Sequence, residues 1–155
     1  MACAGRGNLP GRRAPHQAIG TGGVGIGGRT LRRDLALLAY VHSHGATSRY
    51  VVLSDASDTA APLILLGYHA GSLAGYSGTD PALDGPSLAR LVARGQARYV
   101  VLGGVFSTRG GNRATAAVAR ACKIVPPPIW GGLAPAYHSL ALFDCAGRAR
   151  ALASA

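Results

Sequence analysis

The sequence contains no glutamate and only one lysine, so its charge rests on few residue types. Of its 155 residues, 16 are basic and 6 acidic, which gives a formal net charge of +10. Nearly all the basic residues are arginine and glycine is abundant, a bias typical of GC-rich coding sequence as much as of a binding surface. Residues 1–33 hold six arginines and no acid, whereas residues 34–155 set ten basic against six acidic side chains. The part expected to fold is only mildly basic, so nucleic acid is not the expected partner.

Long hydrophobic runs are also missing. The longest apolar run, around residues 60–67, has about eight residues, whereas a membrane-spanning helix needs roughly 20. The N-terminal segment lacks the apolar core of a signal peptide. We therefore expect neither a signal peptide nor a transmembrane segment in this chain. A hydrophobic fraction of 48% is nevertheless too high for a disordered chain, and 155 residues suffice for one domain with one core.

Motifs for metals, cofactors and catalysis are absent or incomplete. His42 and His44 lie two residues apart, so on a helix they point to different faces. The three cysteines form no CxxC pair, and no GxSxG nucleophile motif occurs. A formal GxGxxG at residues 20–25 has no buried strand before it, as a dinucleotide site requires. We predict no metal site, no cofactor and no catalytic residue.

What the sequence does contain is a repeat. The pentapeptide RYVVL occurs at residues 49–53 and again at 98–102. Each copy follows an amphipathic segment and a glycine, so the repeated unit reads helix, glycine stop and β-branched strand. The same alternation predicts helices at 31–44, 60–66, 87–94 and 113–122, and strands at 50–53, 70–75, 98–102 and 139–145. This pattern indicates a three-layer α/β domain with a mostly parallel sheet of about four strands and helices on both faces. The two RYVVL segments are expected to be its central strands.

Three segments are expected along the chain. Residues 1–30 are rich in glycine and arginine and are predicted to be a flexible linker or tail. Residues 31–148 are predicted to form the single α/β domain. Residues 149–155 are predicted to be a C-terminal tail.

Candidate binding residues come from the loops that follow the predicted strands. In open α/β sheets, ligands bind beyond the carboxyl ends of the strands. The loops there read SDASDT, GYSGTDP and GGVFSTRGGN. The third loop offers guanidinium and backbone N–H groups to an anion at a helix N-terminus. The alternative is that these side chains serve as helix caps and turn formers. The candidates for one shared crevice are Asp55, Asp58, Ser77, Asp80, Arg109 and Arg113.

Two cysteines end predicted elements. Cys122 ends a helix and Cys145 ends the last strand, so both are expected near one edge of the sheet. From the residues alone, a disulfide and a pair of buried thiols are equally compatible with this placement.

One block of the chain resembles a known family. A small-residue helix at residues 60–67 precedes the turn GYSGTDP at 75–81, a helix ending in a glycine stop at 91–95, and a strand running into glycines at 98–104. Cys122, Trp130 and the terminal Phe-Asp-Cys at 143–145 fit the same pattern. Over about residues 35–146, the chain resembles the C-terminal extracytoplasmic domain of bacterial mannosyltransferases related to protein mannosyltransferases and aminoarabinose transferases.

The resemblance implies a function that this chain does not carry out by itself. In that family the domain follows a multi-pass membrane region and a glycine-rich linker, and the catalytic carboxylates lie in the membrane region. The whole enzyme moves a sugar from a polyprenyl-phosphate donor to an extracytoplasmic acceptor. The resemblance therefore implies an accessory or acceptor-recognition role, a transmembrane glycosyltransferase region as partner, and a polyprenyl-phosphate sugar or glycan acceptor as ligand. It implies a place at the extracytoplasmic face of the cell membrane, and it favours a disulfide between Cys122 and Cys145.

Two other hypotheses come from different classes. Under the first, the chain is a free-standing, non-catalytic α/β module that binds a small anion such as a sugar phosphate through Arg109 and Arg113. Alternatively, the arginine-rich segment at residues 1–33 binds nucleic acid, which predicts an affinity that falls steeply with salt.

Overall fold

The computed structural model describes residues 28–45, 48–103, 110–132 and 140–155. The helices are α1 (Gly28–Ser43), α2 (Ser57–Leu65), α3 (Gly85–Ala93), α4 (Arg113–Ala121) and α5 (Ala149–Ala153), with a short 3₁₀ helix at Pro127–Ile129. The strands are β1 (Val52–Ser54), β2 (Ala70–Ser72), β3 (Tyr99–Gly103), β4 (Lys123–Val125) and β5 (Leu140–Asp144). Of the predicted linker at residues 1–30, residues 1–27 lie outside the described residues. The last three residues belong to α1, which begins at Gly28.

The strands form one sheet in the order β2-β1-β3-β5-β4. β1 is parallel to β2 and to β3, and in the latter pair Leu53 lies opposite Val100. The RYVVL copies thus supply two neighbouring strands, and β3 is the central strand of the sheet. The predicted mostly parallel α/β sheet is confirmed, because four of the five strands run in one direction.

The C-terminal part differs from the prediction in three ways. The sheet has five strands, since Lys123–Val125 forms the additional strand β4. The last strand, β5, is antiparallel to both β3 and β4 and lies between them. Residues 149–155 do not form a tail: they include α5, whose Leu152 is fully buried. The alternation of strands and helices predicts a mostly parallel sheet, but the described residues between β4 and β5 hold only the 3₁₀ helix at Pro127–Ile129, and β5 returns antiparallel to β4.

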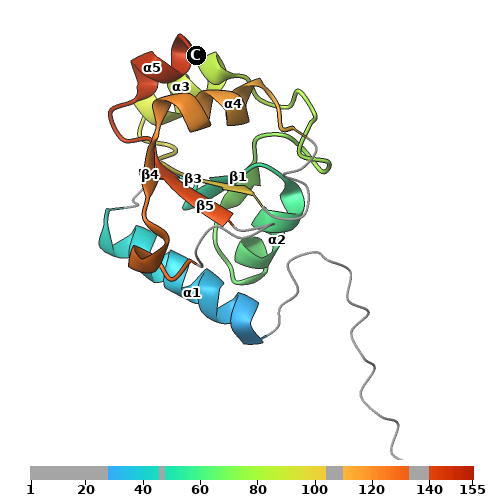
Figure 1. The fold of residues 1–155 in the computed structure, drawn as a ribbon, viewed down its shortest axis with the longest axis vertical. Coiled ribbons are helices and arrows are strands. Elements are labelled where there is room, and N and C mark those ends of the chain that lie inside the picture. The colour runs from blue at the N-terminus through green and yellow to red at the C-terminus, as the bar shows by residue number, and fades with distance from the viewer. Residues whose placement is uncertain (1–27, 46–47, 104–109, 133–139) are drawn as a thin grey trace, which may run out of the picture.

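Helices cover both faces of the sheet (Figure 1). Side chains alternate along a strand, so in β3 Tyr99 and Val101 enter one core and Val100 enters the other. The first core lies between the sheet, α1, Leu63 of α2 and Trp130. The second lies under α3, α4 and α5, and includes Leu88, Val118 and Leu152. This arrangement is the predicted three-layer architecture.

A disulfide and an ion pair hold the end of β5 in place. A disulfide joins Cys122, at the end of α4, to Cys145, directly after β5. The pairing that the family resemblance favoured is therefore present. Arg98, which precedes β3, forms a bidentate ion pair with Asp144, with N–O distances of 3.0 and 2.7 Å. The disulfide ties the end of β5 to the start of β4, and the ion pair ties it to the amino end of β3.

Candidate functional site

A hollow of about 220 Å³ opens at the carboxyl ends of β1 and β3. This is the edge of the sheet at which open α/β proteins bind ligands. The walls consist mainly of glycine backbone and small or apolar side chains, with one carboxylate among them. The lining residues are Asp55, Gly78, Leu102, Gly103, Gly110, Gly111, Thr115, Ala116 and Ala119.

Asp55 is the carboxylate of this hollow, and it is held by the backbone on both sides. It follows β1 directly, and only 5% of its surface is exposed. Its Oδ1 accepts a hydrogen bond from the Ala56 N–H at 2.8 Å, and its Oδ2 accepts one from the Gly103 N–H at 3.0 Å. The side chain thus connects the end of β1 with the end of β3 and keeps a fixed orientation beside the hollow.

The pKa of Asp55 lies above its ordinary value. Burial is the main cause, because it disfavours the charged form, and the negative charge of Asp58 adds to it. The hydrogen bonds from Gly103 and Ala56 act in the opposite direction and only partly offset these effects. A buried carboxyl with a raised pKa beside a hollow is typical of binding and catalytic sites.

Asp58 lies close to this carboxyl, in the first turn of α2. The expected capping alternative is wrong for this residue: the N-cap of α2 is Ala56, which makes no side-chain cap. Asp58 Oδ1 accepts a long 3.4 Å hydrogen bond from Thr59, while Oδ2 is buried and has no hydrogen-bond partner among the described residues. A buried acceptor without a donor is costly, but Asp58 does not line the hollow, so this oxygen does not face a ligand there.

Ser77 and Asp80 bind each other in the turn at residues 75–81. Ser77 donates to Asp80 Oδ1 at 3.1 Å, and neither side chain lines the hollow. Asp80 packs so closely on Gly75 that a Cβ there would lie 2.2 Å from Asp80 Oδ2. Gly75 also has a φ of +67°. These two residues shape the turn, and it is Gly78 that the turn contributes to the hollow.

Asn112 links this turn to α4 and was not singled out from the sequence. It is the N-cap of α4 and forms a capping box with Thr115. Its Nδ2 group contacts the backbone oxygens of Leu73, Asp80 and Leu83 at 2.8, 2.9 and 3.2 Å. The Asn-x-x-Thr spacing at residues 112–115 signals the cap, but no local pattern shows the three carbonyl partners.

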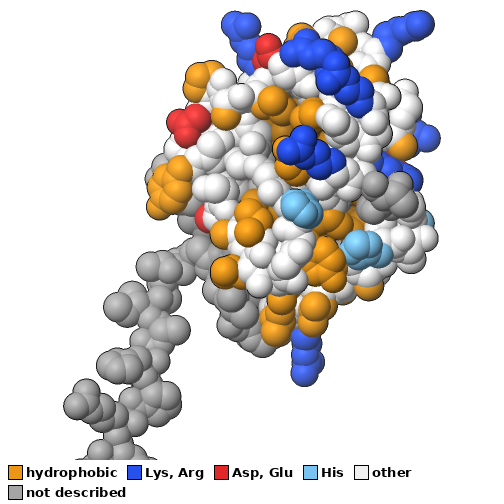
Figure 2. Space-filling model, turned by 180° about the vertical axis from the view of Figure 1, so that it is seen from behind, with side chains coloured by type: hydrophobic (Ala, Val, Ile, Leu, Met, Phe, Trp, Pro, Cys, Tyr) orange, Lys and Arg blue, Asp and Glu red, His pale blue; other side chains and the backbone are white. Residues whose placement is uncertain are grey.

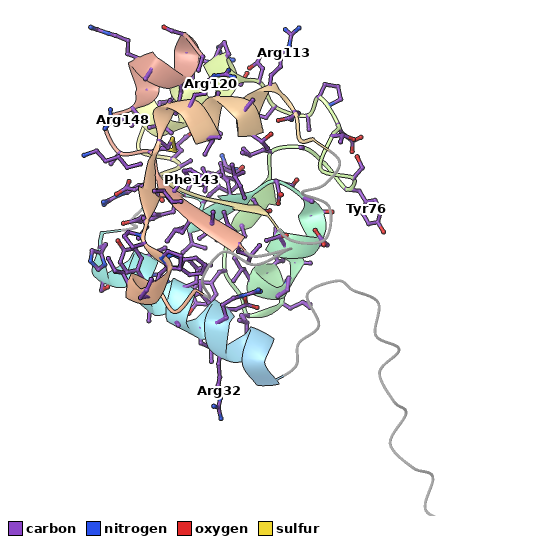
Figure 3. All side chains as sticks on the ribbon, viewed as in Figure 1. Arg32, Tyr76, Arg113, Arg120, Phe143 and Arg148 are labelled. Atoms are coloured by element: carbon purple, nitrogen blue, oxygen red, sulfur yellow. A yellow bond between two sulfur atoms is a disulfide. The ribbon has the colours of Figure 1, made fainter. Side chains whose placement is uncertain are left out.

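Arg113 does not complete the expected crevice. Arg113 is exposed and points away from the sheet into solvent (Figure 3). It lines a separate recess of about 510 Å³ together with Arg120, Asp84 and Ala155. Arg109 lies outside the described residues. Of the six predicted residues, Asp55 therefore lines the hollow, Asp58 lies beside Asp55, and Ser77, Asp80 and Arg113 do not line it.

The described residues show neither a cluster of metal ligands nor a membrane-spanning helix. Among them, no group of three or more His, Cys, Asp or Glu side chains is placed to hold a metal ion. In the same part of the chain, none of the helices combines the length and the apolarity that crossing a bilayer requires.

Comparison with known proteins decides the family. Residues 37–121 match the family model described as "Putative mannosyltransferase YkcB-like, C-terminal". The chain belongs to this YkcB-like family. The matched segment contains all the described residues that line the Asp55 hollow. The resemblance seen in the sequence is thus confirmed, and the hollow is part of the shared domain.

A curated relative extends this result. The chain is 31% identical over 97 residues to the protein named "Putative mannosyltransferase YkcB" of Bacillus subtilis (strain 168). The alignment covers 62% of this chain and 13% of that protein, so the chain spans about an eighth of its relative. No solved structure is significantly similar to the chain.

Proposed function

We propose that this YkcB-like domain is the accessory C-terminal part of a membrane glycosyltransferase. In this proposal the whole enzyme uses a polyprenyl-phosphate-linked sugar at the extracytoplasmic face, and the domain binds a sugar unit in the Asp55 hollow. The single observation that carries the proposal is Asp55: a buried, backbone-held carboxylate in a hollow that belongs to the family's shared domain.

The chemistry of the hollow suits a hydroxylated ligand. Each Asp55 oxygen accepts a hydrogen bond from one backbone N–H and keeps a second lone pair, which can accept a hydrogen bond from a sugar hydroxyl. The glycines allow a ligand to approach the backbone closely. Leu102, Ala116 and Ala119 offer apolar surface to the C–H groups of a sugar ring.

The size of the hollow limits what it holds. Pockets for drug-sized ligands have volumes of about 300 to 1,000 Å³, and this hollow has about 220 Å³. It therefore accommodates a single sugar unit or the end of a glycan, and the lipid part of a polyprenyl-linked donor would lie elsewhere.

The small-anion hypothesis fits this hollow less well. The described lining residues include a carboxylate, which by itself repels phosphate, and no arginine; Arg109, which this hypothesis also names, lies outside the described residues. Arg113 and Arg120 instead line the recess beside the start of α3. A sugar-phosphate ligand that used Arg113 would therefore bind at that recess and not at Asp55.

The proposal is tested by nuclear magnetic resonance titration of the complete ¹⁵N-labelled chain with methyl α-mannoside and, separately, methyl β-galactoside. We expect saturable shifts at the amides of Gly78, Gly103 and Thr115 with at least one of the glycosides. Asp55→Asn should remove them, because the amide cannot accept both backbone N–H groups and a hydroxyl.

The matched control is Asp80→Asn, in the neighbouring turn, where an amide oxygen still accepts from Ser77. This control should bind like the unaltered chain. If the hollow amides do not shift with either glycoside at tens of millimolar, or if the shifts persist in Asp55→Asn, the proposed sugar site is wrong.

A further inference from the structure

The layer of helices α3, α4 and α5 is strongly basic. Residues 84–94, 112–121 and 148–155, which form these helices and their ends, hold six arginines and a single carboxylate, Asp84. The three helices pack against one another, so their outer sides form one surface, which is called the α3–α5 face below. The two ion pairs between described side chains use other arginines, Arg33 and Arg98. No described carboxylate therefore pairs directly with an arginine of this face.

The geometry of the helices turns these arginines outward. In each helix, a fully buried residue of the core lies two positions from an arginine, which is therefore rotated by about 200° away from the core. The pairs are Leu88 and Arg90, Val118 and Arg120, and Leu152 and Arg150. Figure 3 shows Arg113, Arg120 and Arg148 along the upper side of the domain, and Arg32 of α1 at the opposite side. Seen from behind, lysine and arginine side chains likewise concentrate in the upper half of the molecule (Figure 2).

A recess of about 510 Å³ opens in this face between the start of α3 and the outer side of α4. Arg113 and Arg120 line it, and because seven residues make two helical turns they lie on the same side of α4, about 10 Å apart along its axis. Arg120 donates to the backbone oxygen of Ala155, which uses one of its five N–H donors. Asp84 also lines the recess, but its Oδ1 already accepts the capping hydrogen bond from the Ser87 N–H at 2.8 Å. Two guanidinium groups thus outweigh one carboxylate, which favours an anionic ligand.

The α3–α5 face lacks the apolar side chains that several kinds of anionic partner use. Every exposed large apolar side chain in the described part of the chain lies outside these helices. Protein interfaces have apolar cores, peripheral membrane helices insert apolar side chains beside their cations, and single-stranded nucleic acids stack on aromatic rings. A polyanion held by charge and hydrogen bonds alone, such as an acidic glycan, fits this face best.

The recess also adjoins the Asp55 hollow. Ala116 of α4 lines both of them. Its side chain is a single methyl group, so a ligand longer than one sugar unit can pass over it from the hollow to the recess. This continuity favours a glycan over other polyanions.

We propose that the α3–α5 face binds the acidic part of a glycan, whose carboxylate or phosphate groups pair with Arg113 and Arg120. The inference rests on the proposed function for the sugar unit in the Asp55 hollow, and it adds the chemical class of the glycan. Guanidinium groups suit this task because they pair with carboxylate and phosphate through two parallel hydrogen bonds.

The test is nuclear magnetic resonance titration of the complete ¹⁵N-labelled chain with two tetrasaccharides of the same linkage, a mannuronate tetramer and mannotetraose. They differ in charge, since only the first carries carboxylates. We expect the mannuronate tetramer to bind more tightly, to shift the amides of Gly85 and Ala116, and to bind less tightly as sodium chloride screens the charges. Arg113→Glu should weaken its binding roughly fivefold or more, because an attraction is replaced by a repulsion. Arg120→Gln, which alters the other guanidinium, should also weaken it.

The matched control is Arg32→Glu, which makes the same charge change on an exposed side chain of α1 at the opposite side. This control should bind the mannuronate tetramer nearly as well as the unaltered chain. Equal affinity for the two tetrasaccharides, or equal losses in Arg113→Glu and Arg32→Glu, would overturn the proposal. Tighter, Arg113-dependent binding to duplex DNA or to phosphatidylglycerol vesicles would also overturn it. Arg113-dependent binding of the mannuronate tetramer without any shift by the methyl glycosides would support the acidic-glycan site and refute only the Asp55 sugar site.

Discussion

Reduction of the Cys122–Cys145 disulfide should destabilise the domain by an amount that depends on the number of residues between the two cysteines. The two residues are 23 positions apart. The chain-entropy relation for a loop of that length gives about 3.4 kcal/mol at 25 °C. With roughly 2 to 4 °C per kcal/mol for a chain of this size, the midpoint of thermal unfolding should fall by about 7 to 14 °C.

The assay is equilibrium urea unfolding of the same chain with and without a phosphine reductant. Comparing redox states is cleaner than replacing the cysteines, because Cys145 is fully buried and its truncation would add the cost of a cavity. The background variant Cys3→Ser prevents cross-linking through the remaining cysteine. Thiol titration of the unfolded, unreduced natural chain should find one reactive thiol, since three cysteines are present and two are bridged.

Two outcomes would refute this reasoning. Three reactive thiols in the unreduced chain would mean that the bond does not form. A free energy of unfolding that changes by less than about 1 kcal/mol on reduction would mean that the loop is already constrained in the unfolded state, contrary to the entropy model.

Two further predictions concern the turn at residues 75–81 and the end of β5. Gly75→Ala should lower the free energy of unfolding by about 1 to 3 kcal/mol, because the φ is +67° and the new Cβ would collide with Asp80. Gly67→Ala, at φ +88° but with nothing within 4 Å, should cost less, and equal losses in urea unfolding would contradict this explanation. Burial alone would raise the pKa of Asp144, but the hydrogen bonds from Arg98 and the Ala146 N–H, with the charges of Arg98 and Lys123, outweigh it and lower the pKa below the usual 3.8. The stabilisation is therefore present above about pH 4 and lost as the pH falls through the lowered pKa, and Asp144→Asn should remove that loss from the pH–stability curve.

The sequence predicted the parallel half of the fold well because its signals are local. Each RYVVL copy is a buried β-branched run after a glycine stop, and β1 and β3 follow from that pattern alone. β4 was missed because it has only three residues, of which Lys123 and Ile124 are exposed, and prolines follow at once. The direction of β5 depends on its connection and neighbours, which its own residues do not encode.

The candidate site was likewise predicted only in part. Asp55 was predictable since it follows a buried strand at the edge where ligands bind. The expectation of one crevice failed for Arg113 because the start of α4 turns its side chain outward, toward the recess beside α3. Asn112 was missed because its three carbonyl partners lie 29 to 39 residues away in the chain.

The contacts of Asn112 have a consequence for selectivity. Its amide fastens the turn that carries Gly78 to the start of α4, beside Gly111, and both glycines line the Asp55 hollow. These two walls cannot separate to admit a larger ligand unless the hydrogen bonds of Asn112 break. On this side the hollow is preorganised. A sugar bound there, as proposed, would be selected by shape, and an added substituent would be excluded by steric conflict instead of being accommodated by induced fit.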